Sequence, residues 1–477
     1  MRKARSGAHR LSCARVIGSL GWALGVLGLN LPTAAAQSAV SPPGGALALA
    51  GVTVIDVTDG RLVPDQTVVV VDNRVRIVGP ARAVHVPSGA QVVDARGKYL
   101  VPGLWDMHVH ADSPDDAELY PRYLAHGVTG LREMAQRFEG GADSFHTWQR
   151  AIRAGTRVGP RVAGPSADVN SPNSMHALLG VSLEGPGSIV ISTPEDARRV
   201  VDSLQAAGMA FIKMHDDMIS VDVYFALLRE ARRVGIPVVG HTPTFATDVE
   251  VADSGQRSVE HVGSIRCWHP VMIQDNGASQ DSLTDAEKEH QCAAAVAAYI
   301  RNGTWLVPTV VQPRATLTPE TPEQAQQIAR DVHTGQRVVE LLHRLGARAF
   351  LAGTDLRGPR PGFSLLEEVV LLAESGLTPL EALQAATLNP AQFFHATDSL
   401  GAVAPGKLAD LVLLDANPLV DIHNILQTRA VVANGRYFDR AALEAMDPDG
   451  QQLAREYEDY GKQYPSSSAT GGAPRGS

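Results

Sequence analysis

Apolar and polar positions follow two different patterns along the chain. From Leu47 to about Leu100, short apolar runs such as LALAGVTVIDV and QTVVVVDNRVRIVG are separated by turn signals at Asp59-Gly60 and Asp72-Asn73. No helical period accompanies these runs, so the pattern predicts β-strands. After Pro102-Gly103, short apolar runs instead alternate with amphipathic stretches such as PEDARRVVDSLQAAG and DVYFALLREARRVG. This second pattern is typical of strand–helix units.

The second part of the chain offers eight candidate strands. They are Leu104–His110, Gly127–Met134, Arg161–Pro165, Met209–His215, Ile236–His241, Ser258–Gly263, Thr304–Thr309 and Ala349–Asp355. Eight strand–helix repeats predict an α/β fold, a (β/α)8 TIM barrel.

The β pattern returns near the end of the chain. A helix pair, LTPLEALQAATLNPAQFF, precedes GAVAPGKLADLVLLDANP and RAVVANGRYFD. We expect the two β-rich ends to pair into one small domain beside the barrel. The predicted segments are residues 37–101 for its first part, 102–394 for the barrel, 395–437 for its second part, and 438–477 for a C-terminal helix and a disordered tail.

The first 36 residues have the order of a secretory signal peptide. Basic residues of the first fifteen positions precede an apolar stretch from Val16 to Leu31, and Ala34-Ala35-Ala36 offers a cleavage site before Gln37. The apolar stretch is shorter than the about 20 residues that a spanning helix needs. We therefore expect an exported protein, periplasmic or secreted, with no stable membrane span after processing; a retained anchor is the alternative.

Composition excludes several classes of protein. Hydrophobic residues make up 44% and charged residues 19%, which excludes wholesale disorder and a polytopic membrane protein. The formal charge of −9 and the lack of a basic run argue against nucleic acid as a partner. Outside the leader, Cys267 and Cys292 remain, and the sequence leaves a disulfide between them open.

The candidate chemistry lies where the predicted strands end. Active sites of barrel enzymes lie at the C-terminal ends of the strands. Five predicted strands bring metal-ligand residue types to this end: His108, His110, Lys213, His241, His261 and Asp355. His108 and His110 are two positions apart on one strand, so their side chains face the same side of the sheet. Singly, each histidine is compatible with an ordinary packing role; together they predict a metal site.

Other residues have secondary or alternative roles. Asp106 lies on the face of His108 and is expected to orient the histidine pair. Lys213 either reaches solvent or is converted to a carbamate that bridges two metals. His215 and His176 are candidate substrate contacts. Arg357 is a candidate to bind a substrate carboxylate, with Arg266 as an alternative.

The ordered motifs resemble the amidohydrolase superfamily. The matching pieces are LVPGLWDMHVH, FIKMH, VVGHTP, SVEHVG, LAGTD, LNPAQFF and APGKLADLVLLDANPL. The chain is most similar to the branch that contains imidazolonepropionase-like proteins, Xaa-Pro and Xaa-Arg dipeptidases and ochratoxin amidases. This resemblance implies a TIM barrel with a small composite β-sandwich formed by both chain ends.

The resemblance also implies a ligand set. His108, His110 and Asp355 would bind the more buried metal, His241 and His261 the more exposed one, and carboxylated Lys213 would bridge them. The expected cofactors are two divalent ions, with Zn²⁺ favoured by ligand type. The expected partner is a small amide or dipeptide, and a homo-oligomer is left open.

The predicted reaction is hydrolysis of an amide or peptide C–N bond, in an N-acyl amino acid or dipeptide-like substrate, by metal-activated hydroxide, with Asp355 moving the proton. The alternatives are a mononuclear deaminase or cyclic-amide hydrolase, a lactone or phosphoester hydrolase, and a non-catalytic scaffold of the same fold.

Overall fold

The computed structural model describes residues 45–111, 118–134, 141–174, 188–268, 283–316, 319–356 and 360–464. The predicted signal peptide lies outside these ranges. Among the helices that they contain, none combines the length and the apolar character that a membrane crossing requires.

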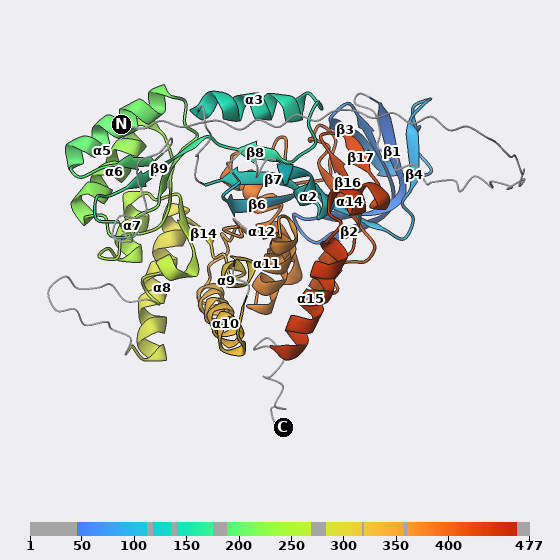
Figure 1. Cartoon of the computed structure of the whole chain (residues 1–477). Coiled ribbons are helices and arrows are strands. Elements are labelled where there is room, and N and C mark those ends of the chain that lie inside the picture. Colours follow the sequence, from blue (N-terminus) through green and yellow to red (C-terminus); the bar gives the residue numbers. More distant parts are fainter. Residues whose placement is uncertain are drawn as a thin grey trace, which may run out of the picture. The chain divides into compact units, whose positions relative to one another are not determined.

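The two β-rich ends of the chain share one sheet. Its strands pair in the order β17-β16-β15-β5-β1-β2-β3, and β4 pairs with β1. The two ends meet where β5 lies antiparallel to β15, with Pro102 opposite Leu411. Figure 1 shows the early and late strands side by side. The strands are β1 (Ala46–Asp56), β2 (Arg61–Val71), β3 (Arg74–Pro80), β4 (Gln91–Asp94), β5 (Tyr99–Pro102), β15 (Leu411–Leu414), β16 (Thr428–Ala433) and β17 (Arg436–Phe438).

Between these ends the strands are parallel and form a curled, TIM-barrel-like α/β domain. One set pairs in the order β6-β7-β8 and the other in the order β10-β9-β11-β12-β13-β14. Their bounds are β6 (Leu104–Val109), β7 (Val128–Glu133), β8 (Arg161–Ala163), β9 (Ser166–Asn170), β10 (Ser188–Val190), β11 (Phe211–Met214), β12 (Val238–Gly240), β13 (Ser258–Glu260) and β14 (Trp305–Val307).

The segment predicted as the last strand, Ala349–Asp355, is hydrogen-bonded on both sides but is not a continuous strand. The backbone N–H of Leu306 on β14 donates to the carbonyl of Ala349 (2.9 Å), and the N–H of Met107 on β6 donates to that of Ala352 (2.8 Å). The segment and the residue after it form only isolated bridges, between Phe350 and Leu306 and between Leu356 and Val109. The segment nevertheless carries Asp355 to the end of β6.

The third predicted strand is wrong in its extent. The chain continues past Pro165 as β9, and Gly164-Pro165 separates this strand from β8. Proline has no N–H to donate, so the ladder is interrupted there. β8 pairs with β7, whereas β9 pairs with β11.

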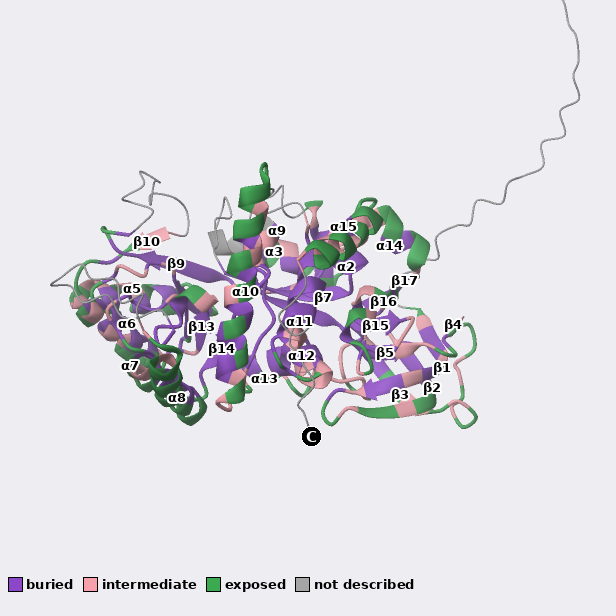
Figure 2. Ribbon diagram, turned by 90° about the horizontal axis from the view of Figure 1, so that it is seen from below, coloured by how far each residue is buried: buried purple, intermediate pink, exposed green. Residues whose placement is uncertain are grey.

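Helices follow the strands and cover them. Five of the helices whose N-terminal caps the structure describes begin with a capping box, in which a threonine side chain accepts from the backbone N–H of the third helical residue. The threonines are Thr193, Thr247, Thr284, Thr321 and Thr378. Figure 2 shows β13 and β14 buried, whereas α8 and α10 expose one side. The helices are α2 (Tyr120–Ala125), α3 (Gly141–Arg153), α5 (Pro194–Ala206), α6 (Val221–Val234), α7 (Asp248–Ser254), α8 (Asp285–Asn302), α9 (Gln312–Thr316), α10 (Pro322–Arg344), α11 (Phe363–Glu374), α12 (Pro379–Ala385), α13 (Leu388–Phe393), α14 (Arg440–Met446) and α15 (Gly450–Gln463).

A disulfide joins Cys267, which follows β13, to Cys292 on α8. Both cysteines are buried. The pairing that the sequence left open is therefore present, and it ties the segment after β13 to the helix that follows it.

Candidate metal centre

The structure brings the six predicted ligand residues to one end of the parallel strands. His108 lies on β6 and Lys213 on β11. His110, His241 and His261 each follow directly after a strand, and Asp355 precedes the bridge residue Leu356. Parallel strands end at the same edge of a sheet, so residues from distant parts of the sequence meet there.

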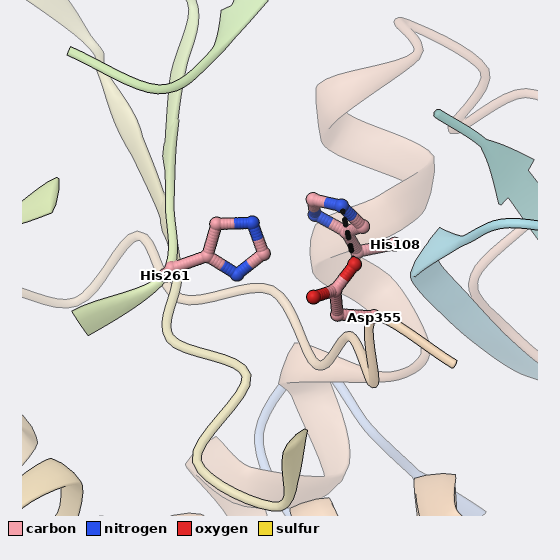
Figure 3. Close-up of side chains that lie close together, drawn as sticks. All are labelled: His108, His261 and Asp355. Atoms are coloured by element: carbon pink, nitrogen blue, oxygen red, sulfur yellow. Dashed lines mark ion pairs between the residues drawn. The ribbon is translucent and has the colours of Figure 1, made fainter. Parts of the chain in front are cut away.

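Asp355 lies beside His108 and His110. Its Oδ1 is 2.8 Å from Nε2 of His110 and 3.4 Å from Nε2 of His108. His108, His261 and Asp355 each offer one ligand atom, and these atoms lie within 4.8 Å of one another. Figure 3 shows the three side chains pointing toward a common point. A divalent ion could be held between them.

The remaining members adjoin these three. Nζ of Lys213 is 3.5 Å from Nε2 of His108. The ring of His241 lies 4.9 Å from that of His261, centroid to centroid, and the His261 ring lies 4.6 Å from that of His108. All six residues therefore form one continuous cluster, as the sequence predicted for their positions.

The backbone of the cluster adopts an unfavourable conformation at three non-glycine residues. φ is +67° at His261, +55° at Asp355 and +50° at Thr309, which contacts His261. Such values are uncommon outside glycine and concentrate at functional sites. They aim the side chains inward from segments that leave the strands.

Burial keeps the imidazoles neutral. It lowers the pKa of His108 and of His241 well below the usual value, and the nearby Lys213 lowers both further. Burial also lowers the pKa of His261, to about 4. Metals bind the neutral ring, so these three residues are in the required form at neutral pH.

Lys213 and Asp355 carry the charges of the cluster. Burial lowers the pKa of the fully buried Lys213, while Glu260 and Asp355 act to raise it. For Asp355, burial acts to raise the pKa, but His261, His110 and Lys213 outweigh it, and the pKa lies below its usual value. The neutral imidazoles and the ionised carboxylate fit a divalent cation.

Asp106 does not orient the histidine rings as predicted. Its carboxylate accepts from the backbone N–H of His108 (3.2 Å) and of Thr354 (3.1 Å), and from the Thr354 hydroxyl (2.7 Å). It therefore joins the backbone of β6 to the segment that carries Asp355. Burial raises the pKa of Asp106 to about 7.

The rings are held instead by residues that the sequence analysis missed. Nδ1 of His108 lies 2.9 Å from Oε2 of Glu260, and Nδ1 of His261 lies 2.8 Å from Oγ1 of Thr309. Glu260 pairs in turn with Arg132 on β7. The sequence does carry a signal for this pair: Glu260 lies inside the apolar strand SVEH and Arg132 inside VTGLRE. Charged residues are rarely fully buried unless they are paired, so two charges within apolar strands indicate a buried ion pair.

The candidate substrate residues have separate outcomes. His215 lies at the cluster, with its ring 5.4 Å from that of His241 and its Nδ1 3.1 Å from Oδ2 of Asp168 on β9. Arg357 and His176 lie outside the described residues. The guanidinium of Arg266 donates to the carbonyls of Thr242 (2.7 Å) and Gly263 (3.3 Å), so it braces the two segments that follow β12 and β13.

Comparison with known proteins matches most of the chain. The model of the amidohydrolase family matches residues 99–438. An adenine deaminase of Rubrobacter xylanophilus is 26% identical over a 399-residue alignment that covers 80% of this chain and 56% of that protein. The chain thus spans about half the length of the curated relatives it matches.

Solved structures match along nearly their whole length. A structure described as a putative prolidase from Bifidobacterium longum has 25% identity and a TM-score of 0.63, covering 86% of this chain and 100% of the other. A bottromycin amidohydrolase has 25% identity and a TM-score of 0.64, covering 86% of this chain and 90% of the other.

Proposed function

We propose, from the premise that the chain belongs to the amidohydrolase family, that it is a metal-dependent hydrolase of an amide or peptide C–N bond. Membership of this enzyme family confirms the resemblance predicted from the motifs. The proposed substrate is an N-acyl amino acid or a dipeptide-like molecule. The convergence of four histidines, Lys213 and Asp355 at one strand edge carries the proposal.

Two divalent ions are proposed at this site, with zinc favoured by the imidazole ligands. His108, His110 and Asp355 would hold one ion, and His241 and His261 the other. Lys213 would bridge them as a carbamate, because an unmodified ammonium within the cluster would repel both cations. The complete burial of Lys213 supports this assignment, since a buried charge requires compensation.

Bound divalent ions would supply an activated hydroxide and polarise the scissile carbonyl. Among the chain's own groups, Asp355 can accept a proton at its carboxylate, because its lowered pKa leaves it ionised at neutral pH. It would pass that proton to the leaving nitrogen. Its side chain is 19% exposed, which leaves an approach from solvent.

A second candidate function is hydrolytic deamination of a purine-like base. The curated relatives that the chain matches include adenine deaminases. One ion held by His108, His261 and Asp355, the group with ligand atoms within 4.8 Å, suffices for this reading. Lys213 would then remain an ordinary lysine.

Metal analysis followed by a substrate screen tests the two candidates. The protein is purified without chelator, supplied with zinc and bicarbonate, and offered N-acyl amino acids, dipeptides, lactones and adenine. Two zinc equivalents and release of an amine from an acyl compound support the main proposal. One equivalent and ammonia from adenine support the second. Loss of the reaction on chelation, and its return with zinc, shows that activity depends on bound metal.

Two finer features also belong to the proposal. The hydrogen bonds that flank residues 349–355 support a ring of strands closed between β14 and β6. Export is proposed from the basic, apolar and small-residue order of residues 1–36.

A further inference from the structure

Behind His108 lies a fully buried ion pair between Arg132 on β7 and Glu260 on β13. Nη2 of Arg132 is 2.9 Å from Oε1 and 2.8 Å from Oε2 of Glu260. Neither side chain is exposed at all. The pair crosses the interior of the curled sheet and ends at a predicted metal ligand, because Oε2 of Glu260 is 2.9 Å from Nδ1 of His108.

Arg132 is held at every part of its guanidinium. Nε donates to the carbonyl of Met107 (2.5 Å), Nη1 to the hydroxyl of Ser258 (3.1 Å), and the group lies 4.9 Å from the centre of the Phe393 ring. The Ser258 hydroxyl in turn donates to Oε1 of Glu260 (2.5 Å). Arg132 and Ser258 thus hold the carboxylate of Glu260 in place, and its Oε2 is the oxygen directed at His108.

We propose that Arg132 and Glu260 are positioning residues that hold the imidazole of His108 with Nδ1 protonated and Nε2 directed into the metal centre. The inference rests on the proposed metal-dependent function. Nε2 is the atom that lies 3.4 Å from Oδ1 of Asp355 and 3.5 Å from Nζ of Lys213. A carboxylate can only accept, so its contact with Nδ1 selects the tautomer that leaves the Nε2 lone pair available.

A contribution to folding stability does not by itself explain why Arg132 and Glu260 are buried here. Moving two charges out of water is costly, and apolar replacement of a buried ion pair is often neutral or stabilising. The contact with His108 gives the pair a role that apolar residues cannot fulfil. Metal affinity and folding stability should therefore respond differently to its removal.

The main test replaces the whole network by apolar side chains, in the triple variant Arg132→Met, Ser258→Ala and Glu260→Leu. Including Ser258 avoids leaving its hydroxyl without partners. Zinc affinity of the chelator-treated, bicarbonate-supplied protein is measured by competition with a chromophoric chelator. We expect affinity to fall about 10–100-fold, with little change in the unfolding midpoint of the metal-free protein.

A matched control exists in a second buried ion pair. Nη2 of Arg314 is 3.1 Å from Oε1 of Glu367, with side chains 8% and 0% exposed. Glu367 also pairs with Arg360 (3.4 Å). Within the described residues none of these three contacts a site histidine, so the triple variant Arg314→Met, Arg360→Met and Glu367→Leu should leave zinc affinity unchanged. Unequal effects of the two apolar replacements separate positioning from general loss of a buried pair.

If the triple variant does not fold, the single variant Glu260→Gln provides a second test of the same proposal. Nη2 of Arg132 contacts both oxygens, whereas the Ser258 hydroxyl donates to Oε1 alone, so the amide oxygen should occupy the Oε1 position and the amide NH₂ should face His108. A donor facing Nδ1 selects the opposite tautomer, with the proton on Nε2. We expect at least a tenfold loss of zinc affinity and an altered visible spectrum of the cobalt-substituted protein.

The outcomes are distinguishable. If the wild-type chain binds zinc and the variants bind it equally well with an unchanged cobalt spectrum, the positioning role is overturned while the proposed function stands. If the wild-type chain binds no divalent metal, the proposed function fails and this inference fails with it. An equal loss of affinity in the control variant would also overturn the specific role of Arg132 and Glu260.

Discussion

The hydroxyl of Thr309 lies 2.8 Å from Nδ1 of His261, and both residues have positive φ. The contact occupies one ring nitrogen and leaves Nε2 for a ligand. The next two residues, Val310 and Val311, donate their backbone N–H groups to the carboxyl group of Glu368 on α11 (3.2 and 2.8 Å). The segment after β14 therefore positions His261 much as β13 positions His108.

We predict that Thr309→Val weakens metal binding. Valine keeps the size and β-branching of threonine but cannot hydrogen-bond the ring, so His261 loses its fixed orientation. We expect about a tenfold loss of zinc affinity, measured by competition titration. Thr309→Ser retains the hydroxyl and is the control; equal affinity in the valine and serine variants would contradict the prediction.

We predict that Lys213→Ala loses metal and activity. The carbamate supplies negative oxygens, whereas an ammonium about 4 Å from a unit positive charge is repelled by about 4 kcal/mol at an effective dielectric near 20. Short-chain carboxylic acids should restore part of both losses. Lys213→Arg keeps the positive charge and should fail as badly, while replacement of the exposed Lys462 is the control. Full activity and two metals in Lys213→Arg would favour a mononuclear site.

We predict that Glu368 makes folding stability fall as pH rises. Its burial raises the pKa to about 8, against an ordinary value of 4.5, and the N–H groups of Val310 and Val311 oppose this only in part. Between these pH values the folded protein retains a proton that the unfolded chain has released, so stability decreases with increasing pH. Glu368→Gln cannot ionise, and its urea midpoint should decline less between about pH 4.5 and 8. Parallel curves for the two proteins would refute the assignment.

We predict that the Cys267–Cys292 disulfide stabilises the fold. The cysteines are 25 residues apart, and closing a loop of this size stabilises a protein by about 2–4 kcal/mol. The double variant Cys267→Ser and Cys292→Ser should unfold at lower urea concentration than the oxidised protein. The wild type treated with a reductant should move toward the variant, and the variant itself should not respond to reductant.

We predict that the native protein is exported and begins at or near Gln37. The basic, apolar and small-residue order of the first 36 residues motivates this. Intact-mass measurement of protein from its native host decides it. A retained Met1 on a cytoplasmic protein would be the contrary result.

The sequence by itself determined the alternation of strands and helices and the residues at the ends of most strands that line the site. Alternation of apolar runs with amphipathic stretches is a local property, so helices such as α5 and α6 could be located within a few residues. The motifs around His108, His110, Lys213, His241, His261 and Asp355 located the candidate site, because parallel strands end at one edge whatever their separation along the chain.

Only the tertiary structure decided which atoms meet. The rings contact Glu260 on β13 and Thr309 on the segment after β14, and Glu260 in turn contacts Arg132 on β7. These contacts depend on strand register and on positive φ values that no local pattern encodes. For the same reason residue type and spacing predict a ring contact for Asp106, which instead accepts from backbone N–H groups. They also predict a substrate contact for Arg266, which instead braces two loops. Residue type and spacing reveal which side chains are available, whereas hydrogen-bond partners follow from packing between distant elements.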